Sequence, residues 1–266
     1  MIESVINVSE GVDQERLDTL REAVRDSFLD MHVDPDHHRS VFTLCGPHVV
    51  RDALSLLRTA ITLIDLTLHS GVHPRHGVVD VVPFVPLWDS TPQDALRART
   101  EFEVGAAALG VPTARYGEEV GDPSLPALRQ RLRNHPPEDA DPKRGVIAVG
   151  VRRPLVAYNM MVNCDLLEAR IIARQIRSDA IRALALPVGG GIQISTNLIR
   201  PERVTPWDVF QLVGTMTEIL STELVGLIPR SVLEKIPRTK WTLLDLDASR
   251  TIEARYEAKS GPLELR

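Results

Sequence analysis

Apolar and polar positions follow two different periods along this chain, and their alternation predicts strands separated by long helices. Leu17, Leu20, Ala23 and Val24 recur at the three-to-four-residue spacing of an amphipathic helix over 13–27. The pattern also predicts helices at 47–66 and about 91–109, and strands at 2–8, 28–33, 39–45, 80–86 and near 112–116. The first part of the chain therefore reads β-α-β-β-α-β with an added helix and strand.

Residues 117–145 differ from their surroundings, because Pro, Asp, Glu and Arg dominate them and only 124–133 shows a helical pattern. We interpret this segment as a connector. The pattern then predicts strands at 146–151, 154–162, 191–198 and 223–228, helices at 165–184 and 205–221, and an edge strand at 241–247. We therefore expect an α/β (α+β) protein of two ferredoxin-like split βαβ sandwich subdomains, 1–145 and 146–266.

The composition narrows the class of protein further. The 266 residues are 43% hydrophobic, which is enough for a buried core. The net charge is −5 and the basic residues form no stripe, so we expect no nucleic-acid partner. No apolar run reaches the length of a membrane span, and the N-terminus lacks a secretory pattern. The two cysteines lie in apolar settings and are expected to be reduced, which favours a cytoplasmic location.

Three histidines, an arginine and an aspartate gather at the start of the segment 69–86, between a predicted helix and a Val-rich strand. Glycines and a proline interrupt any helix there, so these side chains lie on a loop beside rigid elements. His73 precedes Pro74, which restricts its backbone, and an imidazole is suited to proton transfer near pH 7. The alternatives are a histidine that only braces the loop and a His-rich surface loop without function.

Arg75 and Asp80 follow His73 and suggest binding roles. A guanidinium can hold a substrate carboxylate with two parallel hydrogen bonds, but Arg75 can equally be a structural partner of Asp80. Asp80 opens the strand at 80–86, where it can orient a histidine, bind a polar ring edge or cap a turn. A second polar bend contains Asp34, Asp36, His37, His38 and Arg39, and it either faces the same site or forms a solvated turn.

Several short motifs occur in an order that resembles the formiminotransferase family. They are Asn7-Val8-Ser9-Glu10-Gly11, Arg39-Ser40-Val41, Gly71-Val72-His73-Pro74-Arg75-His76-Gly77 with Asp80 and Pro83-Phe84-Val85-Pro86, Tyr116-Gly117-Glu118, Ala157-Tyr158-Asn159, Ser195-Thr196-Asn197-Leu198 and Glu223-Leu224-Val225-Gly226-Leu227-Ile228-Pro229. The resemblance covers residues 3 to about 230.

This resemblance implies a transferase that moves a formimidoyl group from N-formiminoglutamate to N5 of tetrahydrofolate. It implies that His73 is the catalytic acid and base, and that the substrates, a reduced folate and formiminoglutamate, bind between two subdomains. Tetrahydrofolate would be a co-substrate, no metal would be needed, and the enzyme would be a cytoplasmic homodimer. We expect Asp34, Arg39, Arg75 and Asp80 to contact substrate or folate.

Polar residues of the second half are further candidates for folate or substrate contacts. Tyr158 and Asn159 lie on one predicted strand and Asn197 on another, and amide side chains offer both donors and acceptors to a pterin ring. Asparagines at strand edges and turns are the alternative. The histidines of the first half lack the spacing of a metal site, and Gly189-Gly190-Gly191 lacks the helix and the lysine of a phosphate-binding loop.

The chain also departs from the family pattern. Val72 and His76 replace a glutamate and a methionine beside the motif histidine and arginine, and His38 replaces an asparagine. A long insert is shortened to 134–143. These departures leave two alternatives open: a related transferase with a non-folate acceptor or another one-carbon donor, and a non-catalytic ligand-binding homologue.

Overall fold

The computed structural model describes residues 1–71, 75–117, 120–138 and 140–261, and these fold into two compact units. The first unit is Met1–Arg152, and the second begins at Arg153. Within the described ranges no helix is long and apolar enough to cross a membrane.

The first unit contains a six-stranded sheet with the order β2-β3-β1-β4-β6-β5. Its strands are β1 (Ile2–Val8), β2 (Phe28–Asp34), β3 (Arg39–Cys45), β4 (Val79–Pro86), β5 (Thr113–Tyr116) and β6 (Ile147–Val151). Its helices are α1 (Gln14–Glu22), α2 (Val49–Leu63), the short 3-10 helix η1 (Leu66–Leu68), α3 (Pro92–Ala108) and α4 (Leu125–Asn134). The order β2-β3-β1-β4 is that of a ferredoxin-like split βαβ sandwich, which the sequence predicted.

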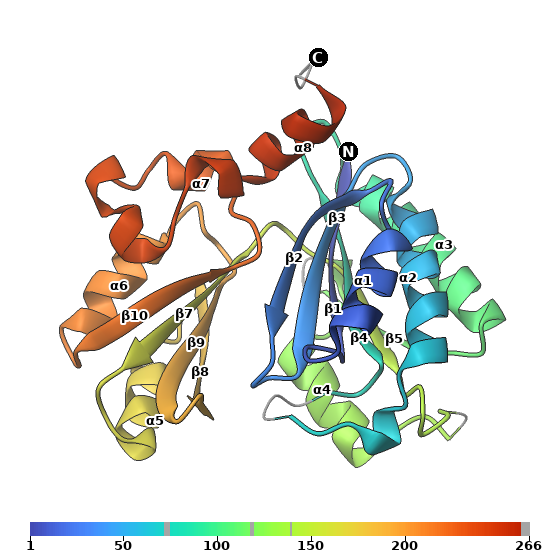
Figure 1. The fold of residues 1–266 in the computed structure, drawn as a ribbon, viewed down its shortest axis with the longest axis horizontal. Helices are drawn as coiled ribbons and strands as arrows, with labels where there is room; N and C mark the ends of the chain where they lie inside the picture. Colours follow the sequence, from blue (N-terminus) through green and yellow to red (C-terminus); the bar gives the residue numbers. More distant parts are fainter. Residues whose placement is uncertain (72–74, 118–119, 139, 262–266) are drawn as a thin grey trace. The chain divides into compact units, whose positions relative to one another are not determined.

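Helix starts in this unit follow from their capping residues. The Asp13 side chain accepts from the Arg16 backbone N–H at the start of α1. Thr91 and Asp94 form a capping box at the start of α3, where Pro92 occupies the first turn. Figure 1 shows α1, α2 and α3 on one face of the sheet, where they bury Ile6, Phe42 and Phe84 completely.

Helix α4 covers the opposite face at the β4-β6-β5 end of the sheet, through Leu128 and Leu132. The sequence predicted this helix, but only as part of a connector. Successive side chains of a strand point to opposite faces. Because Phe42 and Leu44 face α1–α3, Arg39 and Val41 of β3 face away from those helices.

Strand β6 corrects one prediction. We expected 146–151 to open the second half, but β6 lies between β4 and β5 and pairs in parallel with both. Gly77 and Gly145 form an isolated antiparallel bridge, which brings the segments before β4 and β6 together. Gly145 has a φ of +73°, and a Cβ there would lie 2.0 Å from the His76 carbonyl oxygen, so only glycine fits.

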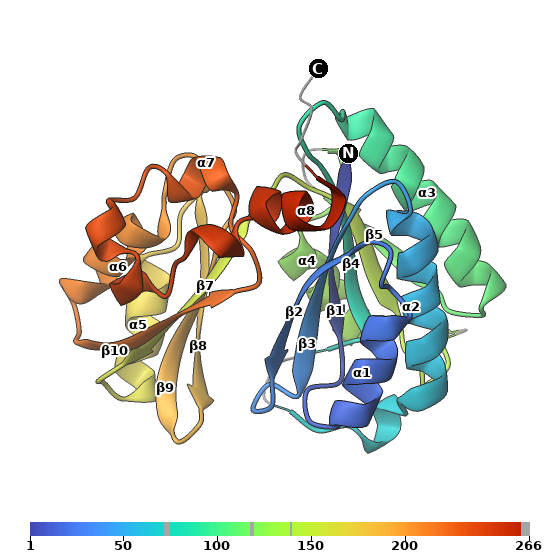
Figure 2. The ribbon, with the colours of Figure 1, turned by 45° about the horizontal axis from the view of Figure 1, so that its top comes forward.

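The second unit has its own four-stranded antiparallel sheet with the order β10-β7-β9-β8, again the ferredoxin-like order. Its elements are β7 (Val156–Val162), α5 (Leu166–Gln175), β8 (Ile181–Val188), β9 (Gly191–Leu198), α6 (Pro206–Gly214), β10 (Ile219–Val225), the short helix α7 (Arg230–Leu233) and α8 (Ile252–Ser260). Figure 2 shows α5 and α6 packed on one face of this sheet, over a core that includes Val156, Tyr158 and Ile194. The predicted fold class is thus confirmed in both units.

Three predictions in this unit were wrong in part or in full. The predicted helix 205–221 ends at Gly214, and β10 begins at Ile219. The predicted helix 165–184 ends at Gln175, and β8 begins at Ile181. Ala and Leu favour helices in general, but β8 buries alternate residues and occupies an edge, where Pro187 is tolerated. The predicted edge strand at 241–247 forms 3-10 turns instead, including η4 (Thr242–Leu244), before α8 begins.

Candidate active site

Asp80 is the centre of a polar cluster in the first unit. Its side chain is almost fully buried at the start of β4. Asp80 Oδ1 accepts from the His76 backbone N–H at 2.8 Å, and Oδ2 accepts from Arg129 Nη2 at 2.8 Å. Arg39 Nη2 lies 3.0 Å from the same Oδ2, and Arg39 Nε donates to Asn7 Oδ1 at 2.9 Å. Three distant segments of sequence therefore meet at one carboxylate.

The Arg75 guanidinium is hydrogen-bonded to the turn between β2 and β3. Arg75 Nη2 donates to the His37 carbonyl oxygen at 3.1 Å, and Nη1 approaches the His38 carbonyl oxygen at 3.3 Å and the ring of His69. Burial lowers the pKa of Arg75, while the charge of Asp80 opposes this. Arg75 is thus fixed in place beside the turn that carries Asp34 and Arg39.

His38 and His69 form a stacked pair, with ring centroids 3.9 Å apart. His38 has a φ of +48° and contacts two acceptors, the Ser70 carbonyl oxygen at 2.9 Å and Glu10 Oε1 at 3.2 Å. His69 Nε2 contacts the His38 carbonyl oxygen at 3.1 Å, and its Nδ1 contacts Arg75. Burial, followed by the charges of Arg75 and His38, lowers the pKa of His69 to about 4. Arg75 Nη1 also lies 2.7 Å from Nε2, so a neutral His69 accepts from Arg75 through whichever ring nitrogen carries no proton.

The segment Asn7–Gly11 contacts the turn between β2 and β3. Glu10 is buried, and its Oε1 accepts the backbone N–H groups of Gly11, Val12 and Asp13, each at 3.0 Å. Burial alone would raise the pKa of Glu10, but these bonds and Arg16 outweigh it, so the pKa is lowered. At Gly11 a Cβ would lie 2.4 Å from the backbone nitrogen of Arg39, so the turn packs directly on the backbone of this glycine.

Asp34 is paired within its own turn. Its Oδ1 accepts from the His37 backbone N–H at 2.8 Å, and its Oδ2 contacts His37 Nδ1. Burial would raise the pKa of Asp34, but the hydrogen bonds from His37 prevail and lower it. Asp34 is therefore held as a carboxylate beside Arg39, its partner in the β2–β3 register.

His73, the predicted catalytic residue, lies outside the described residues. The positions on both sides of 72–74 are described and belong to the cluster. At Gly71 a Cβ would lie 2.4 Å from Arg75 Nη2 and 2.7 Å from the His37 carbonyl oxygen. Gly71 and Arg75, the described residues that flank this stretch, therefore both lie against the backbone of the turn between β2 and β3.

The predicted residues of the second unit take different positions. Tyr158 is completely buried in the core, where its hydroxyl donates to the Leu244 carbonyl oxygen at 3.1 Å and burial raises its pKa. Asn159 and Asn197 lie on the other face of the sheet. Asn197 pairs with Ala157, which is two residues before Asn159 on β7 and therefore on the same face. Asn159 Nδ2 donates to Glu223 Oε2 at 3.0 Å, and Asn197 is exposed.

Comparison with known proteins decides the family. Residues 1–152 match the family model of the N-terminal subdomain of the formiminotransferase domain. The chain belongs to the formiminotransferase family. It is 30% identical to glutamate formimidoyltransferase of Thermoplasma acidophilum, over 97% of both chains. It is 28% identical to the enzyme of the same name from Streptococcus pyogenes, over 95% of this chain and 97% of that one.

Longer relatives match over part of their length. The chain is 32% identical to formimidoyltransferase-cyclodeaminase of Sus scrofa, and the match covers 88% of this chain but only 51% of the pig protein. The shorter relatives, which match nearly from end to end, are named as enzymes. This formiminotransferase-family chain is therefore an enzyme, and the non-catalytic alternative is set aside.

The structure adds family-motif residues whose roles the sequence did not reveal. Glu10 and Asn7 lie in the first motif, yet only the fold shows that they hold His38 and Arg39. Arg129 lies in no motif, and no sequence signal connected it with Asp80. Among the described residues no three His, Cys, Asp or Glu side chains gather as a metal site would require.

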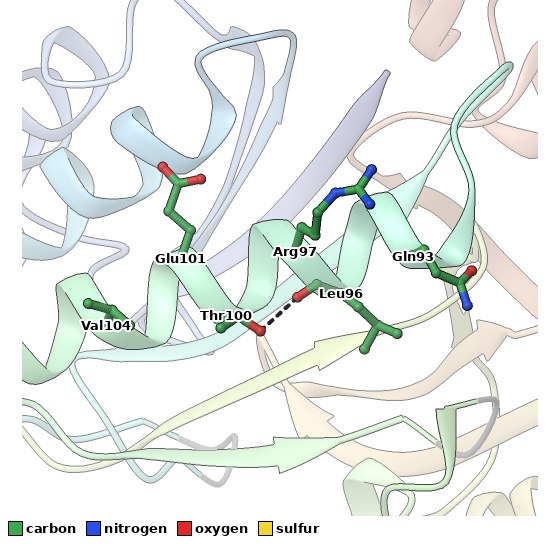
Figure 3. Close-up of a pocket in the computed structure, with 6 residues that line it drawn as sticks. All are labelled: Gln93, Leu96, Arg97, Thr100, Glu101 and Val104. Carbon is green, nitrogen blue, oxygen red and sulfur yellow. Dashed lines mark hydrogen bonds between the residues drawn. The ribbon is translucent and has the colours of Figure 1, made fainter.

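A shallow surface hollow lies away from this cluster, on the outer side of α3. Figure 3 shows Gln93, Leu96 and Thr100 on that helix, with the Thr100 hydroxyl donating to the Leu96 carbonyl oxygen at 3.0 Å. All of its lining residues come from one helix, and it contains no group suited to proton transfer at neutral pH. The Asp80 cluster is therefore the better candidate for the active site.

Proposed function

We propose that this chain transfers the formimidoyl group of N-formiminoglutamate to N5 of tetrahydrofolate and releases glutamate. One observation carries the proposal: the first-unit motif residues Arg39, Arg75 and Asp80, of which Arg75 follows His73 by two positions in sequence, lie in one cluster. The name glutamate formimidoyltransferase of two relatives supports the same reaction.

The reaction needs proton transfers, and the proposal assigns them to His73. The N5 amine of tetrahydrofolate attacks the formimidoyl carbon, which gives a tetrahedral intermediate. The carbon–nitrogen bond to glutamate then breaks, and the glutamate nitrogen takes up a proton. One imidazole can remove the proton from N5 and return it to the departing nitrogen, which contributes about 10²–10⁴-fold. Holding both substrates together supplies a further large factor, and no step requires a metal.

Binding is assigned to the charged side chains of the cluster. Arg39 and Arg75 provide guanidinium groups, and Asp34 and Asp80 provide carboxylates that accept from a pterin or an amidine. Asn159 and Asn197 remain proposed contacts, on the strength of the motifs that contain them. Tyr158 is left out of this assignment, because its hydroxyl is already bonded within the core.

The proposal also includes a cytoplasmic homodimer, as the resemblance implies, and sedimentation equilibrium tests the dimer. The alternative function is transfer to a non-folate acceptor or from another one-carbon donor. His38 and His76 favour this alternative, because both residues differ from the family pattern and both lie in the cluster.

A steady-state assay with formiminoglutamate and tetrahydrofolate tests the reaction, with glutamate release as the readout. His73→Ala is expected to lose at least about 10²-fold in turnover while folding normally. His135→Ala is the matched control, because that histidine is exposed at the end of α4. A His73→Ala enzyme that keeps more than about a tenth of the wild-type rate removes His73 from the mechanism.

Calorimetry with tetrahydrofolate and folinate separates the two candidate functions. Binding of both, weakened by Asp34→Asn, supports folate as the co-substrate. A folded protein that gives no heat at millimolar concentrations of either ligand favours the alternative acceptor.

A further inference from the structure

One carboxylate is shared by two largely buried arginines in the first unit. Arg129 and Arg39 both contact Asp80 Oδ2, at 2.8 and 3.0 Å. The exposed fractions of these side chains are 17% for Arg129, 12% for Arg39 and 2% for Asp80. Burying a cation costs free energy unless an anion balances it, and here one carboxylate balances two guanidinium groups.

Arg39 interacts with one anion, Asp80, and with two cations, Arg129 and Arg75. Burial is the largest influence and lowers the pKa of Arg39 to about 10. The attraction of Asp80 opposes this, but the charges of Arg129 and Arg75 lower the pKa further. An additional anion at this place would relieve the repulsion between the guanidinium groups.

Two polar atoms beside Asp80 are also unsatisfied. Arg129 Nε and His76 Nε2 are buried and have no hydrogen-bond partner among the described residues. The charges of Arg129 and Asp80 both act on His76, whose pKa is lowered mainly by burial. Buried polar atoms usually have partners, and an exception requires an explanation such as a missing ligand or water.

We propose that Arg129 is a substrate-binding residue that takes a carboxylate of a glutamyl group beside Asp80. The proposal rests on the proposed function, because both substrates of that reaction carry such a group. The guanidinium has five donors, of which Nη2 serves Asp80, so it can hold Asp80 and a carboxylate together. The carboxylate belongs either to formiminoglutamate or to the glutamyl tail of the folate.

Helix α4 is well placed to present Arg129. Leu128 and Leu132 of α4 pack against Val81 and Ala148 of the sheet, so the helix is anchored by its apolar side. Figure 1 shows α4 on the face of the sheet opposite α1–α3. Arg129 lies between Leu128 and Leu132 on this anchored helix, so its backbone is held more rigidly than that of a loop residue would be.

Three variants test the assignment in the assay described above. Arg129→Gln is expected to raise the KM of one substrate by about 10- to 100-fold with kcat changed less than about threefold, because a charge-assisted hydrogen bond is lost. Arg129→Lys keeps the charge but not the planar fork, so its KM should lie between the two. Arg131→Gln, which is exposed on the same helix, should match the wild type.

The substrate whose KM rises identifies the source of the carboxylate. A rise for formiminoglutamate alone assigns the donor, whereas a rise for tetrahydrofolate that vanishes with tetrahydropteroate, which lacks the glutamyl group, assigns the folate tail. Unchanged KM values for both substrates overturn the proposal. Lower kcat and lower Tm without a change in KM also overturn it, and make Arg129 only a structural partner of Asp80.

A binding measurement keeps this test independent of the reaction. Calorimetry with glutamate and with folinate is run on the wild type, Arg129→Lys and Arg131→Gln, which also covers the case that Arg129→Gln fails to fold. If the wild type shows no transfer but binds glutamate through Arg129, the proposed function fails and the site stands. If all three proteins bind glutamate and folinate equally, the site fails whatever the reaction is.

Discussion

Gly11→Ala is the sharpest test of how this site is held together. Gly11 has no positive φ, so alanine brings no left-handed backbone strain and the effect of the change is steric. The added Cβ would lie 2.4 Å from the Arg39 nitrogen, 2.5 Å from the Asp34 carbonyl oxygen and 2.9 Å from the His38 carbonyl carbon. All three atoms are backbone of the β2–β3 turn, so no side-chain rotation relieves the clash.

The magnitude follows from what has to move. A Cβ contact normally exceeds 3.4 Å, so the turn has to shift by about 1 Å at the place where Asp34 pairs with Arg39. Overpacking of this kind costs about 1–3 kcal/mol. For a unit of this size the Tm should fall by roughly 2–4 °C per kcal/mol. A displacement of about 1 Å in a catalytic site can lower turnover by about 10²-fold.

Gly214→Ala is the matched control for the same change in size. Gly214 ends α6, its φ is not positive, and a Cβ there would lie 4.0 Å from its nearest neighbour, the Ile219 Cδ1 atom. Alanine should leave turnover unchanged and stabilise the unit by about 0.4–1 kcal/mol. Thermal melts and steady-state rates of both variants decide the matter. Wild-type turnover and Tm in Gly11→Ala would refute the view that glycine backbone sets the position of the turn.

Two further predictions concern the side chains above that turn. Arg75→Lys should lower both turnover and Tm, because an ammonium lacks the planar fork whose Nη2 and Nη1 contact the His37 and His38 carbonyl oxygens. An unchanged variant would mean that only the charge matters. His69 has a pKa near 4 in the fold and 6.5 as its ordinary value, so only the unfolded state binds its proton between these pH values, and stability should fall as the pH drops from 6.5 towards 4. His69→Gln should flatten that part of the urea-midpoint profile, and an identical slope in both proteins would exclude His69 as its source.

The sequence predicted those parts of the fold that depend on local pattern. The capped helices α1 and α3 and the alternating strands β1 and β3 follow from their own residues. Split βαβ order in both units follows in turn, because short connections favour few arrangements of such elements. The Gly189-Gly190 turn between β8 and β9 likewise has the positive φ values that a tight hairpin requires.

The sequence failed where pairing or register depends on distant residues. The position of β6 between β4 and β5 depends on the approach of Gly77 to Gly145, which are 68 positions apart in sequence (145 − 77). The start of β8, residues 181–184, was assigned to a helix because its edge position, which permits Ala and Leu in a strand, is a property of the sheet. Arg129 was missed for the same reason, since α4 reaches Asp80 only after it packs on β4 and β6.

The motifs of the first unit differ in what they specify. Asn7, Glu10 and Gly11 contact the turn that carries Arg39 and His38, so this motif fixes the geometry of the site. A matching motif therefore indicates a preserved arrangement more directly than a preserved substrate. Substrate choice depends on the groups that the arrangement presents, and these include His38 and His76, where the chain departs from the family pattern. Exchange of His38 for Asn should consequently alter the preference between donors or acceptors more than it alters the fold, because Asn tolerates the same positive φ.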